Sequence, residues 1–133
     1  MSTVVVLVTH GEAGQAMLAA AEKMVGKIPE LATVRMETGE QQASLSARLE
    51  DAVRTLATSD IKEVLFLVDL FGSTPMRLCC KSCGANSAVV TGVNLAMLFK
   101  LATADRDKPA AELATMLAST GTKSIQVIGA SPT

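Results

Sequence analysis

Short apolar runs alternate along the chain with segments in which apolar residues recur every three or four positions. Residues 4–8 and 64–68 are unbroken apolar runs, which is the pattern of strands buried on both faces. Residues 33–36 and 88–91 are shorter runs that predict two further strands. Residues 124–128 predict a terminal strand. The apolar pattern therefore predicts five strands.

The segments between these strands have helical spacing. Pro75 suits the first turn of a short helix that ends near Cys83, Pro109 opens the last helix, and Gly26 is a reasonable stop for the first. The apolar positions on the four longer helices are Met17, Leu18, Ala21, Met24 and Val25; Leu45, Leu49, Ala52, Val53 and Leu56; Leu95, Leu98, Phe99 and Ala102; and Leu113, Met116 and Leu117. Strands that alternate with helices predict an α/β fold with a doubly wound, mainly parallel sheet.

The length of 133 residues, about half of them apolar, is typical of one domain, which we place at residues 1–133. No internal repeat or long linker divides the chain. We assume the strand order 2-1-3-4, which is common in doubly wound sheets. In that order the first and third strands are neighbours, and a crevice opens between their carboxyl ends.

His10, the chain's single histidine, follows the first apolar run and precedes Gly11. Asp69 follows the third run in the same way. Both residues would flank the crevice of the sheet, where α/β proteins bind ligands. The turn at residues 70–75 adds a glycine, two hydroxyls and a helix start, which suit an anion such as a phosphoryl group.

A histidine beside a carboxylate keeps one ring nitrogen as a donor and leaves a lone pair on the other. That lone pair could take a proton, bind a metal or attack phosphorus. No second histidine supports a metal site, and the Gly-x-Ser-x-Gly elbow of hydrolases is missing around Ser73. Attack on phosphorus uses the neighbouring turn best. The alternative from the residues alone is a structural histidine, with Asp69 capping the next helix.

Composition narrows the remaining functions. The net charge is −1, no basic block is present, and Trp and Tyr are absent, so we expect no nucleic-acid partner. No apolar stretch reaches the length of a membrane span, and the N-terminal run lacks the features of a signal peptide. An odd number of cysteines forms no disulfide framework. We therefore expect a cytoplasmic protein.

The three cysteines are clustered at Cys79, Cys80 and Cys83. Cys80 and Cys83 have the C-x-x-C spacing of a redox or metal pair. A reactive pair, however, usually has its first cysteine at a helix N-terminus, and this pair falls late in the short helix. Packing is the preferred interpretation for Cys79 and Cys80, while redox or zinc chemistry is the alternative.

Three segments together resemble the enzyme IIA domain of mannose-type sugar phosphotransferase systems. They occur in the order of that family and span nearly the whole chain. The segments are residues 8–11 (Val-Thr-His-Gly) with residues 16–18 and Glu22, residues 68–75 (Val-Asp-Leu-Phe-Gly-Ser-Thr-Pro), and residues 91–98 (Thr-Gly-Val-Asn-Leu-Ala-Met-Leu).

The resemblance implies a function and a set of partners. His10 would accept a phosphoryl group from the histidine-containing phosphocarrier protein and pass it to a histidine of the IIB component. The membrane components IIC and IID would be indirect partners. Asp69 would orient His10, and the phosphoryl oxygens would be held by the turn residues Phe71, Gly72, Ser73 and Thr74. We expect no metal ion and no cofactor.

The resemblance also implies a homodimer. Members of the family add an antiparallel C-terminal strand to the parallel sheet and exchange it between two subunits. Residues 124–128 would be that strand. The residues themselves give a reason, because Ile125, Val127 and Ile128 would bury poorly on a monomer, and an unpaired sheet edge is usually covered.

Three positions depart from the pattern of the family. Ser73 replaces the second glycine of the turn, and serine could reject a backbone angle that glycine accepts. Arg77 stands where many members have asparagine, and Ala96 stands where many have proline. These departures leave open a second function, a regulatory or interaction domain in which phosphorylation of His10 is a signal. The sequence names neither the sugar nor the choice between transport and regulation.

Overall fold

A computed structural model describes residues 2–57, 63–82 and 86–129. Its sheet has four parallel strands in the order β2-β1-β3-β4, which confirms the predicted order and fold class. The four strands lie at the predicted apolar runs, although β2 begins two residues before the predicted start at residue 33. The strands are β1 (Thr3–His10), β2 (Leu31–Met36), β3 (Glu63–Val68) and β4 (Ser87–Thr91).

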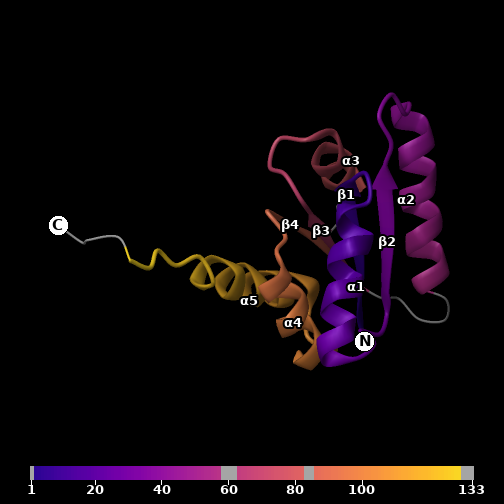
Figure 1. Ribbon diagram of the computed structural model, residues 1–133. Coiled ribbons are helices and arrows are strands. Elements are labelled where there is room, and N and C mark those ends of the chain that lie inside the picture. The colour runs from indigo at the N-terminus through magenta and orange to yellow at the C-terminus, as the bar shows by residue number, and fades with distance from the viewer. Residues whose placement is uncertain (1, 58–62, 83–85, 130–133) are drawn as a thin grey trace.

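In the described part of the chain, five helices cover the two faces of the sheet (Figure 1). Helices α1, α4 and α5 pack on one face, and α2 and α3 pack on the other. In the described part of the chain, no helix is long and apolar enough to cross a membrane. The helices are α1 (Ala13–Val25), α2 (Gln42–Leu56), α3 (Thr74–Ser82), α4 (Leu95–Thr103) and α5 (Ala110–Lys123).

Strand β1 is the centre of the fold because its side chains serve both layers. Val5 and Leu7 join the apolar cluster under α1, α4 and α5, whereas Val4, Val6 and Val8 join the cluster under α2 and α3. All five side chains are fully buried. Successive side chains of a strand point to opposite faces, so only an unbroken apolar run can fill two cores.

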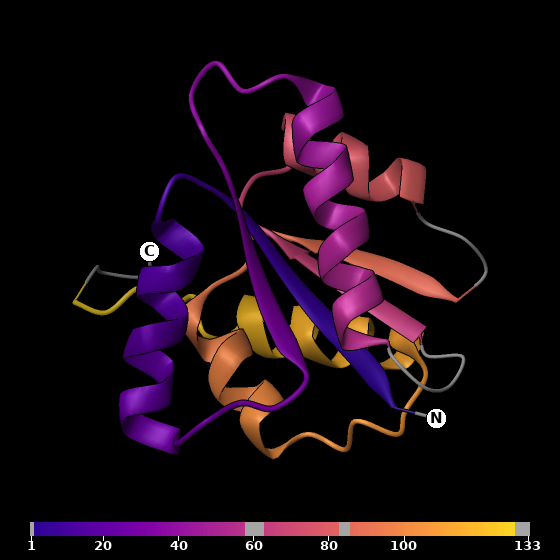
Figure 2. The same cartoon turned by 90° about the vertical axis from the view of Figure 1, so that its right-hand side faces the viewer.

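The register aligns the carboxyl ends of the strands at one edge of the sheet. Val8 of β1 pairs with Val68 of β3, and His10 pairs with Met36 of β2. Asp69 directly follows β3, so it leaves the sheet beside the end of β1. The loops from these strand ends gather at this edge, and the N-terminus lies at the opposite edge (Figure 2).

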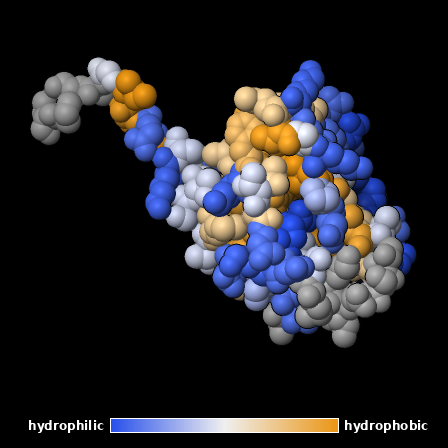
Figure 3. Space-filling model, turned by 90° about the horizontal axis from the view of Figure 1, so that it is seen from below, coloured by the Kyte–Doolittle hydropathy of each residue, from blue (hydrophilic) through white to orange (hydrophobic). Residues whose placement is uncertain are grey.

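Residues 124–128, predicted as a strand, form no strand in the single chain. They extend from the end of α5 away from the sheet, and their apolar side chains project as a separate tail (Figure 3). The exposed fractions are 74% for Ile125, 81% for Val127 and 92% for Ile128. Because the tail lies far from its own sheet, its backbone has no strand to pair with.

Candidate active site

His10 is the last residue of β1 and emerges where the buried strand reaches solvent. The side chain is 43% exposed, although every other residue of β1 is buried. Gly11 turns the chain away at once, with a φ of +53° that suits glycine, and its N–H donates to the Met36 carbonyl at 2.9 Å. A rigid strand thus presents an accessible imidazole.

Asp69 holds this imidazole from the neighbouring strand. Its Oδ2 lies 3.0 Å and its Oδ1 lies 3.1 Å from Nδ1 of His10. The same Oδ2 accepts the backbone N–H of His10 at 2.9 Å, so the carboxylate fixes both the ring and the main chain. An ionised carboxylate can only accept, so Nδ1 carries the proton and Nε2 keeps the lone pair. The predicted pairing of His10 with Asp69 is present.

The turn after Asp69 is shaped by Gly72 and Ser73. Gly72 has the left-handed φ of +79°, and Ser73 does not, so the serine meets no backbone strain. The Ser73 hydroxyl donates to the Leu70 carbonyl at 2.7 Å and accepts the N–H of Met76 at 3.3 Å. It therefore caps α3 and closes the turn. The concern that serine distorts this turn does not apply.

Thr74 and Arg77 form the other side of the same turn. Nη2 of Arg77 donates to the Thr74 hydroxyl oxygen at 3.0 Å, and Nη1 donates to the Gly72 carbonyl at 2.8 Å. The Gly72 N–H meets the sulfur of Met76 at 3.1 Å. The sequence pointed to Arg77 only as a departure from the family pattern, and it did not point to Met76. The contacts of both residues depend on how the first turn of α3 is placed, which the sequence does not reveal.

Two large apolar side chains stand open beside the pair. Leu70 is 57% exposed and Phe71 is 83% exposed, immediately after Asp69. A protein surface can leave such residues uncovered, but two adjacent ones at a polar site are typical of a contact surface for another molecule.

The third motif has a structural function. Asn94 caps α4 by accepting the N–H of Met97 at 3.1 Å, and its amide donates to the Gly121 carbonyl of α5 at 3.2 Å. A Cβ on Gly121 would collide with the Met97 side chain, so glycine permits the close approach of the two helices. Ala96 lies in the first turn of α4.

The two cysteines that the structure describes differ in burial. Cys79 is buried in the core on the α3 face, Cys80 is exposed, and Cys83 lies outside the described residues. Among the residues that the structure describes, no group of three His, Cys, Asp or Glu side chains could hold a metal ion.

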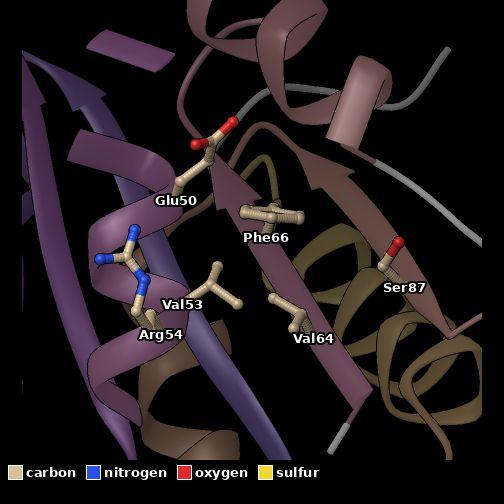
Figure 4. Close-up of a pocket in the computed structure, with 6 residues that line it drawn as sticks. All are labelled: Glu50, Val53, Arg54, Val64, Phe66 and Ser87. Carbon is tan, nitrogen blue, oxygen red and sulfur yellow. The ribbon is translucent and has the colours of Figure 1, made fainter. Parts of the chain in front are cut away.

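A cavity of about 370 Å³ lies elsewhere, between α2 and the sheet (Figure 4). Val53, Val64 and Phe66 form its apolar part, and Glu50, Arg54 and Ser87 complete the lining. Val64 and Ser87 lie at the beginnings of β3 and β4, so this cavity is at the end of the sheet opposite to His10.

The fold and the site define an α/β protein that presents one carboxylate-held histidine at the carboxyl edge of its sheet. A family model described as the PTS system fructose IIA component matches residues 4–126. The chain therefore belongs to the family of enzyme IIA components of mannose-type sugar phosphotransferase systems, as the three motifs predicted.

Individual relatives agree with this assignment. The chain is 29% identical to the mannose-specific EIIAB component of Escherichia coli K12 over 135 residues, which cover 99% of this chain but 41% of that relative. It also resembles the structure of a mannose/sorbose-specific IIA subunit from Enterococcus faecalis, with 27% identity, a TM-score of 0.84, and coverage of 100% of this chain and 99% of that one. A PTS IIA protein from Streptococcus pneumoniae shares the fold, at 22% identity, a TM-score of 0.82 and coverage of 96% and 94%.

Proposed function

We propose that this chain is a phosphocarrier that takes a phosphoryl group on Nε2 of His10 from the histidine-containing phosphocarrier protein and passes it to a histidine of a IIB partner. The observation that carries the proposal is the geometry of the pair, in which Asp69 occupies Nδ1 and leaves Nε2 free on a 43% exposed side chain. The family assignment supports the same reaction. Sugar uptake through membrane components IIC and IID would follow downstream.

The transfer step balances without a cofactor. The Nε2 lone pair attacks the phosphorus of the donor's phosphohistidine, and an N–P bond forms on His10 as the N–P bond of the donor breaks. The electron pair of the broken bond stays with the donor's imidazole. The Nδ1 proton remains between the ring and Asp69, whose negative charge offsets the positive charge of the phosphorylated ring. Transfer to IIB repeats the step with His10 as the donor.

The phosphoryl oxygens would be held by the turn from Phe71 to Thr74. The turn supplies backbone N–H groups and precedes α3, whose amino end favours a negative charge. Ser73 would act through its main chain, since its hydroxyl hydrogen already bonds the Leu70 carbonyl. The exposed Leu70 and Phe71 would form part of the surface on which the protein partners dock.

We also propose that two copies form a homodimer by exchanging residues 124–128. In the described part of the chain β4 pairs on one side only, with β3. A groove of about 340 Å³ runs along β4 and α5 and is lined by Val89, Val90, Thr91, Ala114, Thr115 and Ala118. The exposed apolar tail of a second copy has the length and chemistry to pair as an antiparallel strand there.

Removal of residues 124–133 tests the exchange. The truncated chain should be a monomer, or aggregate through its open edge, whereas the full chain should have twice the monomer mass in light scattering at tens of micromolar. A full chain that is monomeric, or a truncated chain that stays dimeric, excludes the exchange.

Phosphorylation is tested with phosphoenolpyruvate, enzyme I and the phosphocarrier, followed by intact mass measurement. The full chain should gain one acid-labile phosphoryl group, and His10→Ala should gain none while its circular dichroism is unchanged. Labelling of His10→Ala would exclude the proposal. Labelling of His10 without onward transfer to IIB would favour the alternative, a regulatory domain of the same fold.

A further inference from the structure

Arg77 differs from the other arginines in how its charge is used. Arg35, Arg48 and Arg54 each form an ion pair with a carboxylate, and Arg106 is held by backbone carbonyls. The Arg77 guanidinium instead donates to two neutral groups of the active-site turn, the Gly72 carbonyl and the Thr74 hydroxyl oxygen. Among the described residues no carboxylate lies within ion-pair distance of it. An uncompensated positive charge therefore stands beside the turn.

The contact with Arg77 decides what the Thr74 hydroxyl can do. Its oxygen accepts from Nη2 of Arg77, so the hydroxyl hydrogen must point to another acceptor. Among the described residues, the Thr74 hydroxyl donates to no acceptor within hydrogen-bond distance. Ser73 is the opposite case, because its hydrogen is spent on the Leu70 carbonyl. Of the two hydroxyls in the turn, that of Thr74 is therefore the one whose hydrogen is available to a bound phosphoryl group.

The second bond of Arg77 fixes the turn itself. Nη1 donates to the carbonyl of Gly72, the residue whose positive φ sets the direction of the chain. One planar guanidinium therefore ties the main chain at Gly72 to the hydroxyl at Thr74, a geometry that a lysine ammonium, as a point charge, does not reproduce.

We propose that Arg77 is a positioning residue for phosphoryl transfer, which orients the Thr74 hydroxyl as a hydrogen-bond donor to the phosphoryl group on His10 and holds the turn in that state. The inference rests on the proposed phosphocarrier function. It predicts that Arg77 acts through Thr74, so the two residues are coupled, and that the effect lies in the transfer step rather than in partner binding.

The experiment is a double-mutant cycle in rapid-quench labelling of His10 by the phosphorylated phosphocarrier at several donor concentrations. Arg77→Gln should lower kcat about tenfold with KM for the donor nearly unchanged, the scale expected for a misplaced hydrogen-bond donor. Thr74→Val should lower it by at least as much, and the double variant should be no slower than Thr74→Val. Arg77→Lys should remain slow, because charge alone does not replace the fork.

Arg54→Gln is the matched control, since Arg54 is a surface arginine on α2. His10 of this variant should be labelled at the rate of the parent. Circular dichroism of each variant checks folding. An Arg77→Gln rate within twofold of the parent, effects of Arg77 and Thr74 that multiply, or full rescue by lysine would each overturn the inference while leaving the phosphocarrier function intact.

If the parent chain is not labelled by the phosphocarrier at all, the proposed function fails instead. The same variants are then compared with phosphoramidate, a chemical phosphoryl donor for histidine. Slower labelling of Arg77→Gln than of Arg54→Gln supports the inference, and equal rates or no labelling of the parent overturn it.

Discussion

The two edges of the parallel sheet use their polar groups in opposite ways. At the amino edge, polar groups bond to one another and hold the chain together. At the carboxyl edge, His10 is 43% exposed and the large side chains of Leu70 and Phe71 lie open. A parallel sheet places all its strand starts at one edge and all its strand ends at the other. Stability and chemistry can therefore be separated by edge.

Arg106 shows how closed the amino edge is. Its guanidinium donates to the carbonyls of Thr3, Pro29 and Glu30 at 3.1, 2.7 and 2.7 Å, and its own carbonyl accepts the Thr3 N–H at 2.7 Å. Burial lowers the pKa of Arg106. Glu63, at the start of β3, similarly accepts the first N–H of α5 at 2.8 Å. These contacts join loops that are distant in sequence.

The largest effect is expected at the carboxyl edge. Asp69→Asn removes the charge that offsets the phosphorylated ring and weakens the fixed orientation of His10, so the labelling rate should fall by about 10²-fold. Thermal unfolding should change little, because asparagine keeps a side-chain oxygen that can accept the His10 N–H. Rapid-quench labelling with the phosphocarrier measures the rate, and a rate within threefold of the parent would contradict the assigned role of Asp69.

The amino edge should give the reverse result. Arg106→Met keeps the apolar stem but removes the donors to three carbonyls, and it should lower the free energy of unfolding by about 2 kcal/mol. The labelling rate of the folded protein should stay unchanged. Urea unfolding measures the loss, with Arg54→Met as the exposed control, expected within about 0.5 kcal/mol of the parent. A slower labelling rate in folded Arg106→Met would show that the edges are not separate.

The smallest expected effect concerns an ion pair at the carboxyl edge, where some polar groups also bond to one another and stabilise the fold. Arg48 binds Glu40 in the turn after β2 and lowers the pKa of that carboxyl to about 2. Because the pKa of Glu40 is lower in the folded state, the ionised carboxylate stabilises the fold at pH values above the ordinary pKa of 4.5. That contribution to the free energy of unfolding is lost as the pH falls towards 2. Stability of the parent should therefore decline through that window more steeply than that of Arg48→Gln. Parallel curves would contradict the contribution of the pair.

Much of this arrangement follows from the sequence, because strong patterns carry it. The runs at residues 4–8 and 64–68 predicted central strands, and His10 and Asp69 at their ends predicted a shared edge. The contacts of Arg106 and Arg77 were not predicted. Arg106 donates to three backbone carbonyls and Arg77 donates to one, beside the Thr74 hydroxyl. Every residue has a backbone carbonyl, so the sequence holds no signal for those contacts.

The tail and Ser73 show two other limits of the pattern. Residues 124–128 have the composition of a strand, yet a strand needs a partner backbone, and the single chain places none beside them. Ser73 replaces a glycine of the family and raised the question of whether serine accepts the backbone angle there, but within the turn the positive φ belongs to Gly72 and not to Ser73. Backbone angles are set by the whole turn and are not visible at one position.

The central claim is that Asp69 holds Nδ1 of His10 and leaves Nε2 to carry the phosphoryl group. The chain has a single histidine, so its ¹⁵N-labelled imidazole gives one pair of ring signals that two-bond ¹H–¹⁵N NMR can assign. The neutral ring should carry its proton on Nδ1, and after labelling by the phosphocarrier the coupling to phosphorus should appear at Nε2. A proton on Nε2 in the resting protein, or phosphorus on Nδ1, would contradict the account.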